Sequence, residues 1–276
     1  MWLQDVVDED RQGLVLPAIG SGEASVVIPV STTASALTTT GGKASGGLRV
    51  LGSAEATLAV VPASSGGERG WAVVTLGPPA AELRPLKGVW DHTRGLCDLA
   101  CDGADVLFWV ADPDGAAGRN LARHLALGLA SDSIGGAGGI LDRTLDYMKT
   151  RMQFGRLIGS FQALKHRVAD HSIDIALNGH AVRQGVDSAA AKEIDADLWV
   201  AGAKAVASRT FRSVAAGCIQ LHGGVGHTWE FDCHIYMKRA RLNEALGAGD
   251  AAALELVAEA FNQAALAGRA IGEIPL

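Results

Sequence analysis

The stretch TRMQFGRLIGSFQALKH, residues 150–166, ends one predicted helix and begins the next. A basic residue closes the first helix, Gly155 and Gly159 bend the chain, and Ser160 is placed to cap the following helix. Upstream, apolar residues recur at helical spacing: Leu121, Leu125, Leu129, Leu141, Leu145 and Met148. The pattern predicts two helices joined by a tight bend.

Working outward from this bend, the C-terminal part of the chain is helical. The predicted helical segments are 118–153, 160–187, 190–222 and 236–270. Earlier in the chain, short β-branched runs such as SVVIPV, GWAVVTL and DVLFWVA alternate with Gly, Ser, Pro and Thr, which is typical of an antiparallel sheet or small barrel. We therefore predict an α+β fold with a short helical segment (1–23), a small antiparallel β domain (24–115) and a C-terminal four-helix bundle (116–276).

Composition excludes several classes of function. The 276 residues carry a net charge of −6 and no long basic stripe, so nucleic acid is not expected as a partner. The acidic start MWLQDVVDED does not resemble a signal peptide, and no apolar run reaches the roughly 18 residues of a membrane span. The four cysteines form no disulfide framework, so we expect packed thiols in a reducing cytoplasm and no membrane contact.

A glycine run, residues 135–139, interrupts the first predicted helix. A phosphate cradle is one interpretation, but no strand precedes it as a nucleotide-binding loop would require. We favour close packing against a neighbouring helix.

A second bend, QLHGGVGHTWEFD at residues 220–232, closes the third predicted helix. Its glycines expose backbone amides to a ligand that a Cβ would exclude. In the first bend, Arg151 can contact a phosphate through two hydrogen bonds, and Phe154 offers a flat face for a ring. From the pattern alone, two capped loops with a solvated arginine explain these residues about equally well.

The two bends, in this order and about 50 residues apart, closely resemble the C-terminal helical domain of the acyl-CoA dehydrogenases. These flavoenzymes desaturate acyl-CoA thioesters, and their FAD lies across a subunit interface. In the family, an R-x-x-F-G motif and a Q-x-x-G-G turn hold the adenine and pyrophosphate end of the neighbouring subunit's FAD. The resemblance implies that role for the following residues: Arg151, Phe154, Gln220, Gly223 and Gly224, with Gln153 as an additional contact.

The sequence also departs from the family pattern. The family's N-terminal helical domain is largely missing, and its flavin-ring segments are not recognisable in residues 28–39 or 49–56. Desaturation needs a carboxylate to take the α proton. Counting from the two motifs, the family's two positions for that base fall on Gly247 and Leu125, and neither is an acid.

Four acids and three histidines lie near the motifs or the predicted base positions. Asp132 and Glu244 are weak candidates for a displaced base, although roles in packing and solvation are favoured for them. Glu230 and Asp232 are assigned to helix capping. No metal is predicted, because the histidines around the second bend (His222, His227 and His234) lack partner carboxylates and fit contacts to cofactor or partner chain better.

The resemblance therefore implies a subunit of a heteromeric acyl-CoA dehydrogenase, similar to the short subunit of α2β2 steroid-CoA dehydrogenases of actinobacteria. A larger catalytic subunit would hold most of the acyl-CoA, and an electron-transfer flavoprotein would accept the electrons. This chain would complete the FAD site in trans and would be inactive alone. Two alternatives remain, a self-sufficient homomeric dehydrogenase with a displaced base and a flavin-free oligomerisation scaffold.

Overall fold

The computed structural model describes residues 2–31, 37–193, 195–247 and 249–267. The chain divides into two compact units, Met1–His124 and Leu125–Leu276, which are treated separately below. The predicted boundary after residue 115 coincides with the start of helix α3 (Ala116–Thr150), whose first turns belong to the first unit. Ala117 and Leu121 account for this, because both are buried in the core of that unit.

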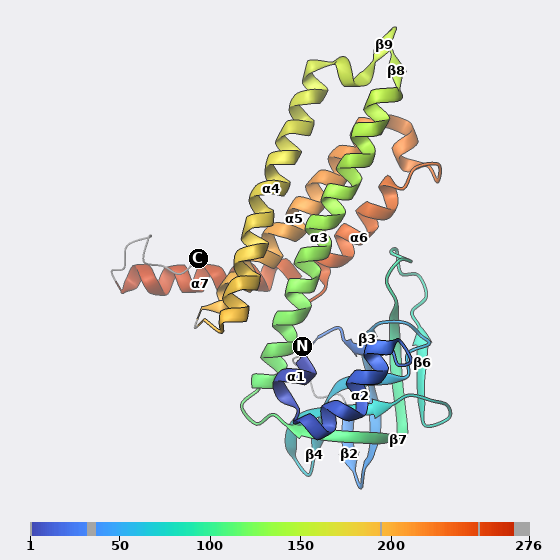
Figure 1. The fold of residues 1–276 in the computed structure, drawn as a ribbon, viewed down its shortest axis with the longest axis vertical. Coiled ribbons are helices and arrows are strands. Elements are labelled where there is room, and N and C mark those ends of the chain that lie inside the picture. The colour runs from blue at the N-terminus through green and yellow to red at the C-terminus, as the bar shows by residue number, and fades with distance from the viewer. Residues whose placement is uncertain (1, 32–36, 194, 248, 268–276) are drawn as a thin grey trace. The chain divides into compact units, whose positions relative to one another are not determined.

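The first unit is built on a seven-stranded sheet whose strand order is β1-β3-β2-β4-β5-β7-β6. An additional pairing between β3 and β7 closes the strands from β3 to β7 into a small barrel (Figure 1). The strands are β1 (Val26–Pro29), β2 (Leu37–Thr40), β3 (Lys43–Leu51), β4 (Leu58–Ser65), β5 (Glu68–Thr75), β6 (Ala81–Pro85) and β7 (Leu96–Ala111). The predicted β domain is confirmed with one correction, because β4 pairs in parallel with β1 and β2.

Two short helices, α1 (Trp2–Val6) and α2 (Glu9–Ser21), precede the sheet and pack on it. The Trp2 ring meets the Trp71 ring edge-on at a centroid distance of 5.4 Å, and Trp2 Nε1 donates to the Ala117 carbonyl at 2.7 Å. These contacts join the N-terminal helices, β5 and the start of α3 into one core.

Asp112 fixes the start of α3. Its carboxylate accepts hydrogen bonds from the amides of Ala117 and Gly118, both at 2.9 Å, and from Trp71 Nε1 at 3.1 Å. Burial acts to raise the pKa of this carboxyl, but the two backbone hydrogen bonds and the indole outweigh it and lower the pKa below its ordinary value. The carboxylate is therefore charged and satisfied beneath the first turn of α3.

The second unit contains the rest of α3 and the helices that pack beside it (Figure 1). They are α4 (Gln162–Ala191), α5 (Ala196–His222), α6 (Cys233–Ala245) and α7 (Gly249–Leu266). The prediction of a single fourth helix over 236–270 is wrong, because the helix is interrupted between α6 and α7. Gly247 has φ 67° and Gly249 has φ 77°, a left-handed backbone that ends a helix. Residues 268–270 of that prediction lie outside the described residues.

Small residues let the helices of this unit approach closely. A Cβ on Gly136 would lie 2.5 Å from Cζ of Phe211, a fully buried ring on α5. This contact confirms the packing interpretation for Gly136, whereas a Cβ on Gly135 or Gly138 would have no atom within 4 Å. Likewise, a Cβ on Gly217 of α5 would lie 2.1 Å from Nε2 of His171 on α4.

All four cysteines are buried and free, as expected for packed thiols. Burial raises the pKa of the Cys101 and Cys218 thiols to about 11. These thiols are therefore protonated and unreactive near neutral pH. None of the described helices is long and apolar enough to cross a membrane.

Candidate functional site

The first bend forms a β-hairpin at the end of α3. Its strands, β8 (Met152–Gln153) and β9 (Arg156–Leu157), are joined by Phe154 at φ 53° and Gly155 at φ 73°. Two consecutive positive φ values in a two-residue loop are typical of a type I′ turn, which usually carries Asn or Gly at its first position. A phenylalanine there is strained, and its side chain is 91% exposed. The hairpin therefore displays an aromatic ring that its own described residues do not cover.

The hairpin is held firmly in spite of this exposure. The Ile158 amide donates to the Arg151 carbonyl at 2.8 Å, and the Arg151 amide donates to the Tyr147 carbonyl at 2.9 Å. The Arg156 guanidinium lies 3.9 Å from the centre of the Phe161 ring, a cation–π contact at the foot of the hairpin. The Arg151 side chain is exposed and forms no ion pair with any described residue.

The second bend is a 3-10 turn, η2 (Gly223–His227), in which the glycines have different functions. Gly223 has φ 68°, and Gly226 is buried so closely that a Cβ would lie 2.8 Å from the Ile219 carbonyl oxygen. The chain itself requires both. Gly224 has an ordinary φ and no atom within 4 Å of a Cβ built on it. Its bare backbone is exposed with no structural need in its own chain.

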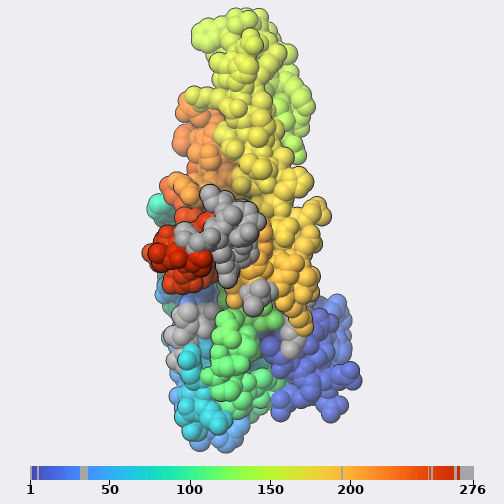
Figure 2. Space-filling model, turned by 90° about the vertical axis from the view of Figure 1, so that its left-hand side faces the viewer, coloured from blue at the N-terminus to red at the C-terminus, as the bar shows by residue number. Residues whose placement is uncertain are grey.

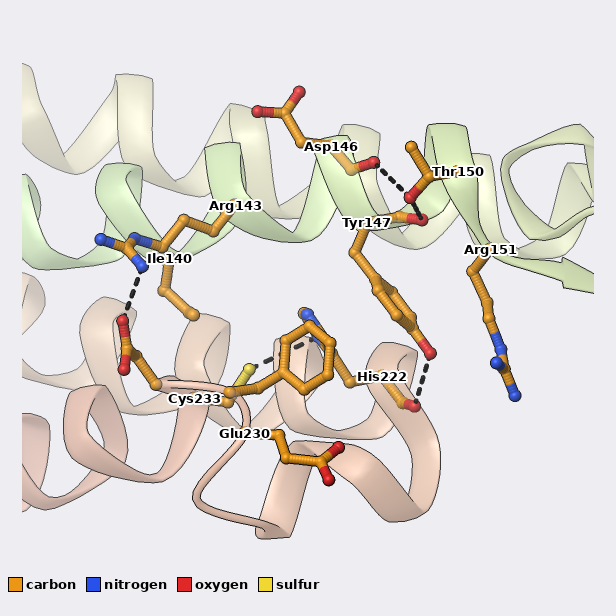
Figure 3. A pocket seen from close by; sticks show the side chains of 11 residues that line it. Ile140, Arg143, Asp146, Tyr147, Thr150, Arg151, His222, Glu230 and Cys233 are labelled. Atoms are coloured by element: carbon orange, nitrogen blue, oxygen red, sulfur yellow. Dashed lines mark hydrogen bonds and ion pairs between the residues drawn. The ribbon is translucent and has the colours of Figure 1, made fainter.

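Tyr147 joins the two bends (Figure 3). Its ring stacks on the His222 ring at a centroid distance of 4.4 Å, and its hydroxyl donates to the His222 carbonyl at 3.5 Å. Tyr147 lies one helical turn before Arg151, and His222 directly precedes Gly223. The motif residues are thus brought to one end of this unit.

His222 is a structural residue rather than a ligand. It is buried, with Nδ1 at 2.9 Å from the Cys218 carbonyl and 3.4 Å from Cys233 Sγ. His234 Nδ1 lies 3.0 Å from the Phe231 carbonyl. Within the described ranges, no three His, Cys, Asp or Glu side chains are grouped as a metal site would require.

A hollow of about 600 Å³ lies between the end of α3 and the start of α6. It is lined by Ile140, Arg143, Asp146, Tyr147, Thr150, Arg151, His222, Glu230, Phe231, Asp232 and Cys233 (Figure 3). Arg143 Nη1 and Asp232 Oδ2 form an ion pair across it at 2.6 Å. Asp232 is the N-cap residue of α6, as predicted, but its carboxylate makes no cap hydrogen bond and binds Arg143 instead. Glu230 is exposed on the rim.

The residues predicted for cofactor binding are all exposed at this end of the unit: Arg151, Gln153, Phe154, Gln220, Gly223 and Gly224. Tyr147 and Arg143 were missed by the sequence analysis. Tyr147 had a usable signal, since it lies one turn before Arg151 on the same helix face. Arg143 had none, because its partner Asp232 is 89 residues away.

The two positions predicted to correspond to the family's base, Leu125 and Gly247, lie beside each other. A Cβ on Gly247 would lie 3.9 Å from Leu125 Cγ and 3.2 Å from Leu129 Cδ1. Both leucines are buried. The atoms nearest to a Cβ on Gly247 are therefore apolar side-chain atoms of these two leucines.

The displaced-base candidates are both engaged by cations. Asp132 Oδ1 lies 3.2 Å from Arg239 Nη1, and its Oδ2 accepts from Asn243 Nδ2 at 2.7 Å. Glu244 binds two arginines, with Oε1 at 3.3 Å from Arg212 Nε and Oε2 at 3.0 Å from Arg241 Nη1. The Asp132–Arg239 pair joins α3 to α6 and the Glu244–Arg212 pair joins α6 to α5, whereas Arg241 and Glu244 both lie in α6.

The fold and the two motifs agree with a family comparison. Residues 118–262 match the family model described as the acyl-CoA dehydrogenase C-terminal domain. The chain belongs to the acyl-CoA dehydrogenase family, a family of FAD-dependent oxidoreductases.

Among individual relatives, the chain is 39% identical to the acyl-CoA dehydrogenase IpdE2 of Mycobacterium tuberculosis over 181 residues, which cover 66% of this chain and 50% of that protein. It is 32% identical to acyl-CoA dehydrogenase FadE34 of the same organism over 197 residues, 70% of this chain and 26% of FadE34. The chain thus spans half or less of the curated relatives it matches.

Solved structures share the fold. The ChsE4–ChsE5 complex from Mycobacterium tuberculosis superposes with a TM-score of 0.81 at 25% identity, covering 95% of this chain and 72% of that one. An acyl-CoA dehydrogenase from Geobacillus kaustophilus gives a TM-score of 0.83 at 20% identity, covering 94% and 74%. The predicted α+β architecture is confirmed by these superpositions.

Proposed function

We propose that this chain is a subunit of an FAD-dependent acyl-CoA dehydrogenase that completes the cofactor site and the oligomer in trans and does not supply the catalytic base. The observation that carries the proposal is the contrast between two regions of the second unit. The exposed hairpin and glycine turn keep the residues that would hold a cofactor, whereas the positions for the base are Leu125 and Gly247.

The exposed residues suit the adenosine diphosphate part of FAD. Arg151 offers an exposed guanidinium to a pyrophosphate, Phe154 offers a ring face to an adenine, and Gly224 offers an open backbone. FAD, when bound, supplies the hydride acceptor for desaturation. The residues of this chain would bind and orient its far end, with Tyr147 holding the two bends in register.

Among the residues that the structure describes, neither candidate acid is placed to act as a proton acceptor. Removal of the α proton requires an unpaired carboxylate within hydrogen-bond reach of the substrate. Asp132 and Glu244 are instead bound by Arg239, Arg212 and Arg241. We therefore place the base on a larger partner subunit, which would also hold most of the acyl-CoA.

The partners follow from the same resemblance. We propose an α2β2 assembly with the larger catalytic subunit, and an electron-transfer flavoprotein as the electron acceptor. A bulky steroid-derived CoA thioester is the proposed substrate. This assignment rests on the likeness to the ChsE4–ChsE5 complex and to the short subunits of steroid-CoA dehydrogenases.

The visible spectrum and mass of the chain test the proposal. The chain is purified alone and after co-expression with the dehydrogenase subunit encoded beside it. A colourless chain that becomes a yellow complex with one FAD per pair supports a half-site subunit. One FAD per chain without a partner would instead establish the self-sufficient dehydrogenase, and a colourless complex would establish the scaffold.

A further inference from the structure

Helices α4 and α5 run antiparallel and meet at contacts that follow one register. From one contact to the next, α4 moves back by two helical turns and α5 moves on by two turns, about seven residues in each. The pairs in this register are Gly185 with Ala203, Asn178 with Thr210, and His171 with Gly217. Figure 2 shows α4 in yellow along the face of this unit that is turned toward the viewer. The same face of each helix is therefore used at all of these contacts.

The pair of His171 and Gly217 is the one closest to the two bends. One more step of the register leads to Leu164 near the start of α4 and to Gly224 in the glycine turn. Helix α4 follows the hairpin directly, after the short 3-10 turn η1 (Ile158–Ser160), and α5 ends where the glycine turn begins. A change in the distance between the helices at this pair would therefore move the hairpin relative to the glycine turn.

The His171 ring lies directly over Gly217. A Cβ on Gly217 would lie 2.1 Å from His171 Nε2 and 2.8 Å from its Cε1, so only glycine leaves room for the ring. The other ring nitrogen, Nδ1, is buried and has no hydrogen-bond partner among the described residues. A neutral ring with its proton on Nε2 fits this place, whereas an added N–H at Nδ1 would be buried without an acceptor.

A positive charge on His171 is disfavoured here. Burial lowers the pKa of His171 below its ordinary value of 6.5, and Arg167 acts in the same direction, although Asp174 and Asp170 act to raise it. These three charged groups lie on α4 itself. On α3, the turn at this level carries Asp142, which is exposed.

The facing stretch of α5, residues 209–222, contains no Asp or Glu. Its titratable residues are Arg209, Arg212, Cys218 and His222. Arg209 is exposed, and Arg212 is bound to Glu244. The turn η1 adds no charged side chain. A protonated His171 would therefore find no carboxylate on α5 or η1, and the ring would have to leave its place over the glycine.

We propose that His171 is a positioning residue for the cofactor-binding end of this unit. Its neutral ring seats α4 on α5 at Gly217, and its protonation displaces the ring and separates the hairpin from the glycine turn. Tyr147 on His222 anchors the α3 side of the hairpin, and His171 anchors the α4 side. The inference rests on the proposed function, which it deepens by assigning an acid-sensitive element to the same site.

Chemical denaturation of the full chain, followed by circular dichroism near pH 7.5 and near pH 5.5, tests the contact without flavin. Unfolding takes up a proton at His171 once the pH falls below about 6.5, because the unfolded ring is the more basic one. Between the two pH values, the unfolding equilibrium constant should rise about fivefold more in wild type than in His171→Gln. His180→Gln is the matched control, an exposed histidine on the same helix that should leave the wild-type dependence unchanged.

A double variant tests the geometry. Gly217→Ala should raise the unfolding equilibrium constant roughly tenfold, because its Cβ displaces the ring. In the His171→Ala chain the same change should have little effect, since the space is free. Gly202→Ala is the control on α5, with its nearest neighbouring atom at 3.9 Å. An equal effect of Gly217→Ala in both chains would overturn the proposed contact.

Flavin release from the co-expressed complex links the contact to the cofactor. Wild type and His180→Gln should release FAD about fivefold faster near pH 5.5 than near pH 7.5, whereas His171→Gln should release it at similar rates. The same pH dependence in His171→Gln and wild type would overturn the positioning role and leave the half-site proposal intact. A complex without flavin at either pH would contradict the proposed function, and the denaturation experiments would still decide whether His171 is an acid-sensitive contact.

Discussion

Leu125 lies beside Gly247, with its Cγ 3.9 Å from the position that a Cβ on Gly247 would occupy. The two positions were identified by separate counts, one back from Arg151 and one forward from Gln220. Their meeting in the folded chain supports both counts, because unrelated positions on α3 and after α6 would have no reason to coincide. Under the proposed function, Leu125 and Gly247 present apolar surface at the two positions predicted for the family's base.

Loss of either candidate acid should affect stability more than catalysis. Asp132→Asn and Glu244→Gln should each leave turnover of the assembled complex within a few fold. Asp132→Asn should lower the free energy of unfolding by about 1–2 kcal/mol, because the charged acceptor for Arg239 is lost. Steady-state kinetics and thermal melting measure the two effects. A loss of turnover by three orders of magnitude in either variant would place the base on this chain.

Arg151→Ala should weaken flavin retention in the assembled complex. The variant removes a charged phosphate contact worth about 1.5–3 kcal/mol, which corresponds to roughly a 10- to 150-fold weaker affinity. Flavin content after dialysis, measured by absorbance, gives the result. Arg209→Ala, which removes an exposed arginine from α5, is the matched control. Equal flavin in both variants contradicts the assignment of Arg151.

Phe154→Gly separates cofactor binding from stability. Glycine accepts the φ of 53° without the steric cost that phenylalanine bears. The free energy of unfolding should therefore be unchanged or higher by up to about 1 kcal/mol, and the melting temperature should not fall. Flavin retention should fall nonetheless, because the exposed ring is gone. A variant that retains flavin like wild type would show that the ring serves another purpose.

Gly136→Ala should destabilise the second unit. Its Cβ would lie 2.5 Å from the fully buried Phe211 ring, and overpacking of this kind costs about 1–3 kcal/mol. Gly135→Ala is the control from the same helix, since nothing lies within 4 Å of its Cβ. There alanine should stabilise the helix by up to about 1 kcal/mol. Chemical denaturation measures the free energy of unfolding of both variants. Equal changes in the two variants would mean that α3 and α5 are farther apart than the Gly136–Phe211 distance indicates.

Acid should weaken the first unit through Asp112. Its pKa is lower in the folded chain than in the unfolded chain, so it stabilises the fold above the unfolded value of about 3.9. That contribution is lost as the pH falls through the folded pKa. Asp112→Asn should be less stable at neutral pH by about 1–2 kcal/mol and should show a shallower loss between pH 5 and 3. If the stability of wild type and of Asp112→Asn fell in parallel with pH, Asp112 would be excluded as the cause of the acid sensitivity.

Local patterns were sufficient to predict most of the fold. The apolar stripe located α3, and the short β-branched runs located the strands, because both signals repeat within a few residues. The break between α6 and α7 was missed. The apolar pattern continues across Gly247, and only the left-handed backbone there shows that the helix stops.

The site was predictable where it depends on motifs and not where it depends on long-range contacts. Arg151 and Phe154 are exposed, as their motif implied. The parallel pairings of β4 and the ion pair between Arg143 and Asp232 join residues far apart in sequence, and no local pattern announces them. The sequence therefore predicted the N-cap position of Asp232 but not the contact of its carboxylate with an arginine 89 residues away.

The stack of Tyr147 on His222 has a thermodynamic consequence for any molecule that touches both bends. The hairpin and the glycine turn are fixed against each other before such a molecule arrives. Binding then loses little conformational entropy in this chain, so the contacts convert more fully into affinity. The surface is preorganised, because its conformational entropy is lost when the monomer folds and not when the assembly forms.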